Sequence, residues 1–219
     1  RACAAAGLSP ASGYTILLST TSPDAAFPST ACHLQRGLGA KGAAAFDVAA
    51  SCSGFLYGLS MADCFIRSGR SRRCLVVAAE IKSRFLDLQD EATAILFGDG
   101  AGAALLIGED AGGGQPRGIM GVRLYADGAG HDLIKIPAGG SRLPASAQTV
   151  QGRLHTIRMQ GKPLFRVAVK RLAGAVTDLL KEFGVGIDDL AQVIFHQANG
   201  RLLSALGKKL GIPPEKTFS

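Results

Sequence analysis

The chain contains no tryptophan, and aromatic residues make up only 6% of its 219 positions. Proteins that bind single-stranded nucleic acid use aromatic side chains set among basic ones as stacking platforms, and this sequence has no such interleaved pattern. It also has no uninterrupted apolar run of about 18 residues, the length that a membrane-spanning helix needs. These absences argue against a nucleic-acid-binding protein and against a membrane protein.

The cysteines form no CxxC pair and are odd in number, and they are Cys3, Cys32, Cys52, Cys64 and Cys74. Disulfide frameworks use paired cysteines, and zinc sites use closely spaced ones. We therefore expect no metal site and reduced thiols in a reducing compartment, which indicates a cytoplasmic protein. All of them except Cys52 are expected to be core thiols.

The composition that is present describes a compact globular protein, with 47% apolar residues and a mean hydropathy of +0.22. The net charge of +7 favours an acidic partner, such as an acidic protein or a phosphorylated ligand. The chain starts at Arg1 without an initiator methionine or a signal-peptide pattern. We expect that both of its ends were cut from a longer chain.

Strand and helix patterns alternate along the sequence. Apolar runs predict strands over residues 14–20, 44–50, 74–79, 101–107, 119–125 and 192–195, and helical spacing predicts helices over residues 29–38, 53–68, 163–183 and 200–210. Glycine and proline predict a surface loop at 111–116, and Gly98–Gly100 is expected to be a tight turn with close backbone packing, not a phosphate loop. The alternation predicts an α/β protein with sheets covered on both faces.

The segment FDVAASCSGF, residues 46–55, places Cys52 between a buried strand and a helix. Small residues let the backbone turn sharply there, so that the thiol would lie at the helix N-terminus, where the partial positive charge lowers the pKa of a thiol. The helix amides could also receive an oxyanion. Cys52 is therefore a candidate nucleophile, although an isolated cysteine is often structural.

The segment VIFHQAN, residues 193–199, ends an apolar strand pattern in His196. A histidine at the carboxyl end of a strand faces the crevice where α/β proteins bind ligands, and it can donate to an oxyanion or move a proton. A structural role remains an alternative for this residue.

Together these segments resemble the β-ketoacyl-acyl-carrier-protein synthase III family of condensing enzymes. Three further stretches agree with it, AAFPSTACHLQRGLG, ILFGDGAGAALL and MQGKPLFRVAVKRL. The resemblance implies a thiolase-like fold of two similar halves, layered αβαβα and here incomplete at both termini. The halves would be residues 1–110, with the nucleophile, and 111–219, with the HQAN segment. The family is usually homodimeric.

The implied reaction is a decarboxylating Claisen condensation in two stages. An acyl-CoA would acylate Cys52, and malonyl-acyl carrier protein would then lose CO2 and attack that thioester, with His196 and a second Asn stabilising the enolate. CoA and phosphopantetheine thioesters are substrates here, so no cofactor is implied. The resemblance leaves open a non-decarboxylating acyltransferase, or a non-catalytic dimer subunit.

The resemblance also implies roles for further residues. Substrate-binding residues would be Phe27, which reaches into the partner's acyl pocket, and Leu96, Phe97, Met159, Gly161, Phe165 and Asn199. Carrier-protein docking would use Arg166, Gln197, Arg201, Lys208 and Lys209. Ordinary core packing is the alternative for the apolar residues, and a solvated helix face is the alternative for the basic ones.

The sequence departs from the family pattern in two ways. The catalytic Asn expected beyond the HQAN helix would lie past Ser219. Glu91 stands where many members place an arginine near the CoA adenine, and Lys162 stands where an Asn is usual. A carboxylate neither stacks like a guanidinium nor attracts phosphates, so the primer could be a carrier-bound acyl group.

Overall fold

The computed structural model describes residues 1–9, 11, 13–109 and 118–218, which fall into two units. The first unit is Arg1–Lys82 with Gly98–Leu124, and the second is Ser83–Phe97 with Tyr125–Ser219. The segment 83–97 belongs to the second unit although it lies between two strands of the first. The division into similar halves at residue 110 stays a prediction.

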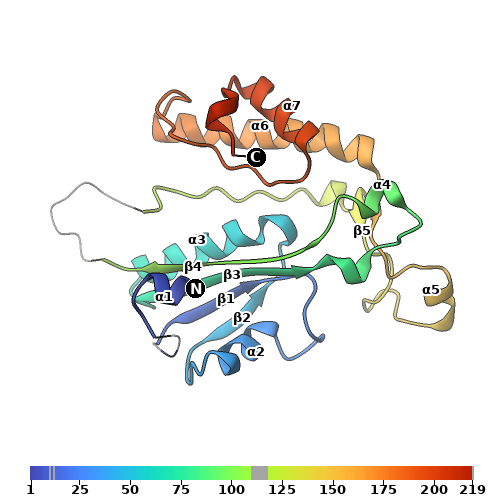
Figure 1. Ribbon diagram of the computed structural model, residues 1–219, viewed down its shortest axis with the longest axis horizontal. Helices are drawn as coiled ribbons and strands as arrows, with labels where there is room; N and C mark the ends of the chain where they lie inside the picture. The colour runs from blue at the N-terminus through green and yellow to red at the C-terminus, as the bar shows by residue number, and fades with distance from the viewer. Residues whose placement is uncertain (10, 12, 110–117, 219) are drawn as a thin grey trace. The chain divides into compact units, whose positions relative to one another are not determined.

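A four-stranded sheet in the order β2-β1-β3-β4 forms the centre of the first unit (Figure 1). Strand β1 (Thr15–Ser19) runs parallel to β2 (Ala45–Val48) and to β3 (Arg73–Ile81). Strand β4 (Asp99–Ile107) pairs with β3 in the antiparallel direction. A central parallel strand is covered on both faces, which is why the middle of β1 is apolar and four of its five residues are buried.

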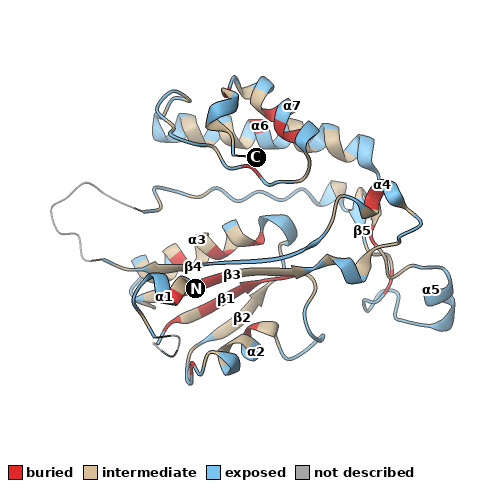
Figure 2. Cartoon of the chain, viewed as in Figure 1, coloured by how far each residue is buried: buried red, intermediate tan, exposed pale blue. Residues whose placement is uncertain are grey.

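Helices cover the two faces of this sheet, with α2 (Thr30–Gly37) on one and α3 (Gly54–Arg67) on the other (Figures 1 and 2). Alternate strand residues point to opposite faces, so Ile16 packs with Ala31 of α2 while Leu17 packs with Ala62 of α3. Short helices complete the unit at Ala2–Ala5 (α1) and Ser51–Ser53 (η1). The expected α/β layering is therefore confirmed for this sheet.

The second unit is built on two helices, α6 (Gly161–Phe183) and α7 (Gly200–Leu210). They pack together around Ala173, Phe195 and Leu206. Both end at a glycine in the left-handed conformation, Gly184 and Gly211, which a residue without a side chain adopts at little cost. The remaining elements are α4 (Glu91–Ala94), α5 (Ala147–Gln151), the ladder of β5 (Ile134–Lys135) with β6 (Arg158–Met159), and the 3-10 turns η2 (Lys82–Phe85, at the unit boundary), η3 (Gly128–Gly130) and η4 (Pro214–Lys216).

Three predicted local structures are wrong. Residues 119–125 form no strand, because among the described residues no neighbouring strand pairs with them. Residues 192–195 form no full strand. Among the described residues, Val193 makes one isolated parallel bridge with Thr217, and no adjacent pairing extends it. Gly98–Gly100 is not a turn, because β4 already begins at Asp99, where pairing with β3 holds it extended. The loop predicted at 111–116 lies outside the described residues.

The prediction of core thiols is confirmed for two cysteines and wrong for two. All five lie in described residues and none forms a disulfide. Cys3 and Cys74 are core thiols as expected, and burial raises the pKa of Cys74. Cys32 and Cys64 are exposed, which corrects the expectation that they belong to the core. They lie on the outward sides of α2 and α3, away from the buried positions that face the sheet.

Burial raises the pKa of Tyr14 to about 12, with the hydrogen bond from Cys3 adding to the effect. In the part of the chain that the structure describes, no helix combines the length and the apolar character needed to cross a bilayer.

Asp47 of β2 caps helix α2 from outside the helix. Its carboxylate oxygens accept the N–H groups of Thr30 and Ala31, each at 2.8 Å. Ser29, at the N-cap position, makes no capping bond with its side chain. A carboxylate satisfies the unpaired amides of the first turn and lies favourably at the positive end of the helix dipole. Asp47 therefore ties α2 to the strand that leads to Cys52.

Glu80 of β3 binds the start of the segment that connects β1 with α2. Its carboxylate accepts the N–H and the hydroxyl of Thr21, each at 3.0 Å, and the hydroxyl of Ser22. Lys82 pairs with it at 3.0 Å. Burial raises the pKa of Glu80, but the hydrogen bonds from Ser22 and Lys82 outweigh burial and hold the pKa of this carboxyl below its usual value. The segment that carries Phe27 is thus held at both ends.

We expect Asp47→Ala to lower the free energy of unfolding by about 1–2 kcal/mol, because two helix amides lose their acceptor. The measurement is urea denaturation followed by circular dichroism. Asp63→Ala is the matched control, since the Asp63–Arg67 pair at 2.8 Å is an exposed i,i+4 contact that contributes about 0.5 kcal/mol or less. Equal losses in the two variants would contradict the capping role.

Candidate functional site

Cys52 lies at a sharp connection between β2 and α3. Strand β2 ends at Val48, the 3-10 turn η1 covers Ser51–Ser53, and α3 begins at Gly54. Ser51 has a φ of +48°, a left-handed conformation that costs a residue with a side chain about 1 kcal/mol. The Cys52 residue is exposed. The strand-to-helix connection expected from the sequence is therefore present.

A close contact seats the start of α3 on the sheet. A Cβ atom added at Gly54 would lie 1.8 Å from the Oγ of Ser19 and 2.9 Å from its Cβ. Ser19 is the buried last residue of β1. Because this approach leaves no room for a side chain, position 54 requires glycine. The contact also fixes the position of the adjacent Cys52 relative to the sheet.

This local arrangement suits a nucleophile. An exposed thiol lies two residues before a helix of 14 residues, and Ser53 makes no capping hydrogen bond with its side chain. The N-terminal amides and the positive end of the dipole stabilise a nearby negative charge, whether on a thiolate or on a tetrahedral oxyanion. The connection can therefore support attack on a carbonyl and stabilise the adduct.

His196 lies in a polar turn of the second unit, between buried Phe195 and helix α7. The residue is exposed, and its carbonyl accepts the N–H of Ala198 at 2.8 Å. It follows the single bridge at Val193, not the end of a full strand. Phe195 packs in the core with α6 and α7, which anchors the turn.

The two polar neighbours of His196 have structural partners. Asn199 is the N-cap of α7, where its Oδ1 accepts the N–H of Leu202 at 2.9 Å. The Gln197 amide donates to the carbonyl oxygens of Phe218 at 2.9 Å and of Phe195 at 3.4 Å. These bonds give both residues a role in holding the turn. Their binding roles stay predictions.

The predicted substrate-binding residues occupy several elements. Phe27 is 85% exposed, and Leu96 and Phe97 are half-buried after α4. Met159 belongs to β6 and Gly161 opens α6. Phe165 packs against the core of the second unit, as the ordinary core alternative expects.

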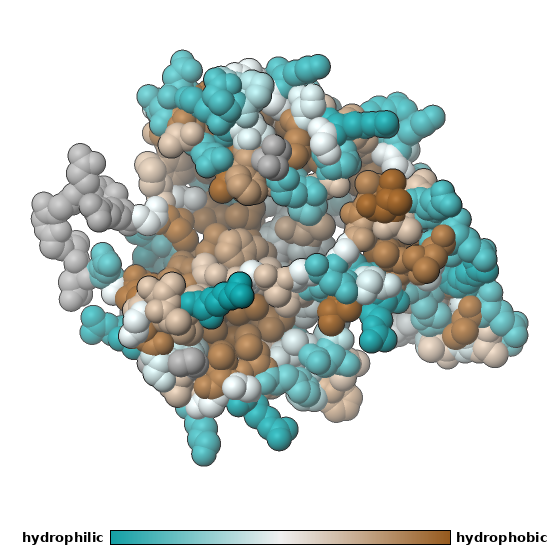
Figure 3. All heavy atoms as spheres, in the orientation of Figure 1, coloured by the Kyte–Doolittle hydropathy of each residue, from teal (hydrophilic) through white to brown (hydrophobic). Residues whose placement is uncertain are grey.

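Apart from Gln197, which precedes α7, the predicted docking residues are exposed on the paired helices α6 and α7. They are Arg166 on α6 and Arg201, Lys208 and Lys209 on α7. In Figure 3 the surface over these helices is largely hydrophilic. Phe27 and Cys52 belong to the first unit, and the other predicted site residues belong to the second.

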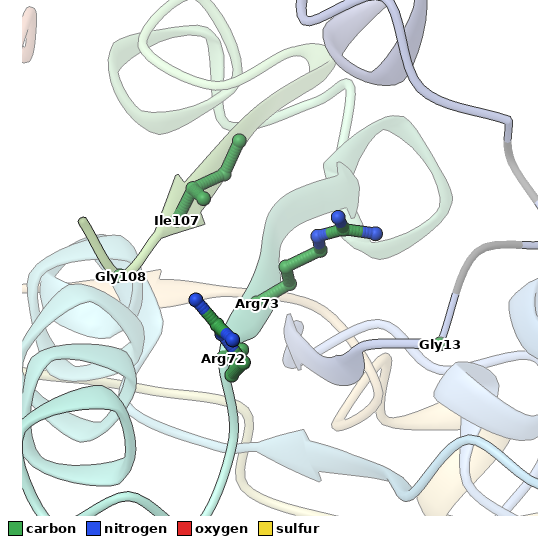
Figure 4. Close-up of a pocket in the computed structure, with 5 residues that line it drawn as sticks. All are labelled: Gly13, Arg72, Arg73, Ile107 and Gly108. Carbon is green, nitrogen blue, oxygen red and sulfur yellow. The ribbon is translucent and has the colours of Figure 1, made fainter. Parts of the chain in front are cut away.

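A pocket of about 420 Å³ in the first unit is separate from Cys52. It is lined by Gly13, Arg72, Arg73, Ile107 and Gly108. Since β2 and β3 both run parallel to β1, the start of β3 lies at the amino ends of these strands, and the Cys52 connection follows the carboxyl end of β2. Figure 4 shows the two arginine side chains pointing in different directions, so they do not converge on one ligand. Among the described residues, no group of three His, Cys, Asp or Glu side chains could hold a metal ion.

The sequence reasoning missed the roles of Asp47 and of the Ser19–Gly54 contact. A carboxylate inside the apolar run AAFDVAA needs buried partners, and that signal was available. The Ser19–Gly54 contact had no sequence signal, because it joins residues from separate elements.

We expect Gly54→Ala to lower the free energy of unfolding by about 1–3 kcal/mol, because the new methyl group collides with Ser19. It should also change the alkylation rate of Cys52, measured by peptide mass spectrometry. Gly174→Ala in α6 is the control. Its Cβ meets nothing within 4 Å, so that change should stabilise the helix by about 0.5–1 kcal/mol.

A second substitution tests the cause of the effect. Ser19→Gly removes both atoms that the new methyl group meets, so the double variant should recover part of the lost stability. If Gly54→Ala were as stable as Gly174→Ala, the close contact would not constrain the connection.

Comparison with known proteins gives a consistent result. A family model for 3-oxoacyl-[acyl-carrier-protein (ACP)] synthase III matches residues 46–128, and the model of its C-terminal part matches residues 180–219. Together they cover more than half of the chain.

Individual relatives agree. The β-ketoacyl-[acyl-carrier-protein] synthases III of Roseiflexus castenholzii and Caldanaerobacter subterraneus are 43% and 44% identical over 99% and 100% of the chain. The crystal structure of 3-oxoacyl-[acyl-carrier-protein] synthase III from Aquifex aeolicus matches 99% of the chain with a TM-score of 0.85 and 40% identity. The chain spans 64–65% of the length of these proteins.

Proposed function

The chain belongs to the 3-oxoacyl-[acyl-carrier-protein] synthase III family, with its thiolase-like fold, and from this membership we propose that it catalyses a decarboxylating Claisen condensation. The substrates are an acyl thioester and malonyl-acyl carrier protein, and the product is a β-ketoacyl thioester. The observation that carries this proposal is the exposed Cys52 at the strand-to-helix connection, within the part of the chain that the family model matches.

In the first stage, the Cys52 thiolate attacks the carbonyl carbon of an acyl-CoA. The tetrahedral oxyanion collapses, the acyl–sulfur bond to CoA breaks, and CoA leaves as a thiol after taking up a proton. Charge on the sulfur and on the oxyanion develops near the positive end of α3, where helix amides stabilise it. The product of this stage is an acyl-Cys52 thioester.

In the second stage, a malonyl thioester loses CO2. The electron pair of the broken carbon–carboxylate bond stays on the α-carbon, which becomes an enolate-like carbanion. His196 donates a hydrogen bond to the thioester oxygen on which the negative charge develops. The carbanion attacks the acyl carbon, the Cys52 sulfur leaves as thiolate, and the β-ketoacyl thioester forms. The packing of Phe195 in the core supports this role, because a preorganised donor must be held by a rigid backbone.

The proposal includes the partners. Exposed Arg166, Arg201, Lys208 and Lys209 would dock an acidic carrier protein, which agrees with the net charge of +7. CoA and phosphopantetheine enter as parts of substrates, and no cofactor takes part. The exposure of Phe27 fits insertion into a partner subunit of a homodimer. Thiols without disulfides suit a reducing, cytoplasmic setting.

Incubation of the full-length protein with acetyl-CoA is expected to add one acetyl mass to the peptide that contains Cys52, measured by peptide mass spectrometry. Cys52→Ser should remove this labelling, because a serine hydroxyl is a far weaker nucleophile than a thiolate. Cys32→Ser and Cys64→Ser are matched controls, since both replace exposed thiols. Labelling of Cys32 or Cys64 in place of Cys52 would reject the assignment.

His196→Ala should keep acylation of Cys52 but lose about 10²–10³-fold in decarboxylation, because one donor to the enolate oxygen disappears. The measurement is release of labelled CO2 from malonyl-acyl carrier protein. His131→Ala, at another exposed histidine, should leave both steps unchanged. Equal loss of both steps would mean that His196 activates the thiol, and full acyl transfer without CO2 release in the wild type would favour a non-decarboxylating acyltransferase.

A further inference from the structure

Asp87 is a nearly buried carboxylate that gathers two arginines. Its side chain is 9% exposed, and it lies 3.2 Å from Nη1 of Arg153 and 3.4 Å from Nη1 of Arg158. All three residues belong to the second unit. The arginine side chains are 47% and 38% exposed, so the pairs are partly buried, and losing the arginines would leave the Asp87 charge uncompensated.

Backbone hydrogen bonds reinforce this cluster on both sides. Asp87 accepts the N–H of Gln89 at 3.1 Å through its side chain and the N–H of Asp90 at 2.9 Å through its carbonyl. The Ile157 N–H donates to the Phe85 carbonyl at 2.8 Å. The segments 85–90 and 153–158 are therefore joined by main chain and side chains together.

Arg153 keeps an unfavourable backbone conformation to make these contacts. Its φ is +52°, which costs a residue with a side chain on the order of 1 kcal/mol and costs glycine nothing. Its carbonyl accepts from Thr156 at 2.7 Å and from Arg158 at 3.2 Å, and its guanidinium also donates to Gln89. The arginine side chain thus reaches Asp87 and Gln89 from a left-handed backbone position.

The joined segments lead directly to residues with predicted binding roles. The segment after Asp87 continues through α4. The N–H of Ala94 donates to the carbonyl of Asp90 at 2.9 Å, and the N–H of Phe97 donates to the carbonyl of Ala94 at 3.4 Å. Arg158 is followed at once by Met159, and β6 pairs Met159 with Ile134. The ion pairs of Asp87 therefore join two segments, one leading to Phe97 and the other to Met159, and these segments are called the two walls below.

We propose that Asp87 is a positioning residue that sets the separation of these two walls and thereby selects the acyl thioester that the site accepts. The inference rests on the proposed function, because the binding roles of Phe97 and Met159 come from it. Asp87 touches neither substrate nor Cys52. It acts through Arg153 and Arg158, whose guanidinium groups keep the second wall against the first.

The test compares Asp87→Asn and Arg153→Gly with the wild type, using the full-length protein and acyl-CoA substrates of two, four and eight carbons. Asp87→Asn keeps the shape and one acceptor for Gln89 but loses the charge. Arg153→Gly keeps the left-handed backbone without strain but loses the guanidinium. Arg171→Gln is the matched control, since it breaks an exposed pair with Asp127 at 2.6 Å.

Both variants should raise KM about tenfold or more for at least one chain length and reorder the preference among the three, because a displacement of about 1 Å in a binding wall can cost up to 10²-fold. The kcat for the best substrate and the alkylation rate of Cys52 by iodoacetamide should stay within about twofold of wild type. Arg171→Gln should match the wild type throughout. A merely structural role would lower all activities in proportion to the folded fraction, which circular dichroism measures.

The outcomes separate the inference from the proposed function. If the wild type fails to acylate Cys52, the proposed function falls and the inference falls with it. If the wild type is active and both variants keep its chain-length preference, only the inference is overturned. Loss of folded protein in both variants would assign Asp87 to stability alone and would also overturn it.

Discussion

The contact between Gly54 and Ser19 is the constraint on which the nucleophile side of the molecule depends. Helix α3 can approach the sheet this closely because position 54 carries no side chain. The chain between β2 and α3 must then turn within a few residues, and Ser51 adopts a left-handed conformation to allow it. The result is an exposed thiol held next to the positive end of a helix, which is the electrostatic environment that a thiolate needs.

Three carboxylates hold segments that carry residues with predicted roles, two of them in the first unit and one in the second. Asp47 caps α2, Glu80 binds the start of the segment before it, and Asp87 gathers two arginines. Each would be costly to bury alone, and each instead accepts several N–H, O–H or cationic donors. Satisfied buried carboxylates fix loops where apolar packing cannot, because their bonds are directional. Residues such as Phe27 and Phe97 thus lie on loops with defined anchor points.

Much of the fold could be predicted where the signal was local. The helices at 163–183 and 200–210 and the strand at 14–20 have clear periodicity and clear ends, and the structure reproduces them within about two residues. The predictions failed where a strand depends on its neighbours. Val193 found a pairing partner only at Thr217 among the described residues, and the glycines near Gly98 became part of β4 because β3 lies alongside. Cys32 and Cys64 were wrongly assigned to the core, because which side of a helix faces the sheet is decided by packing.

The sequence by itself determined which reactive groups are present: a cysteine between a strand and a helix, a histidine before a helix, and two helices rich in basic residues. These are properties of residue type and short-range order, which a linear pattern carries. Only the tertiary structure decided that Gly54 must meet Ser19, that Asp47 caps a helix 16 residues before it, and that Asp87 joins arginines 66 and more residues away. Such contacts arise when separate elements pack, and the distance between two side chains in space is not written in their spacing along the chain.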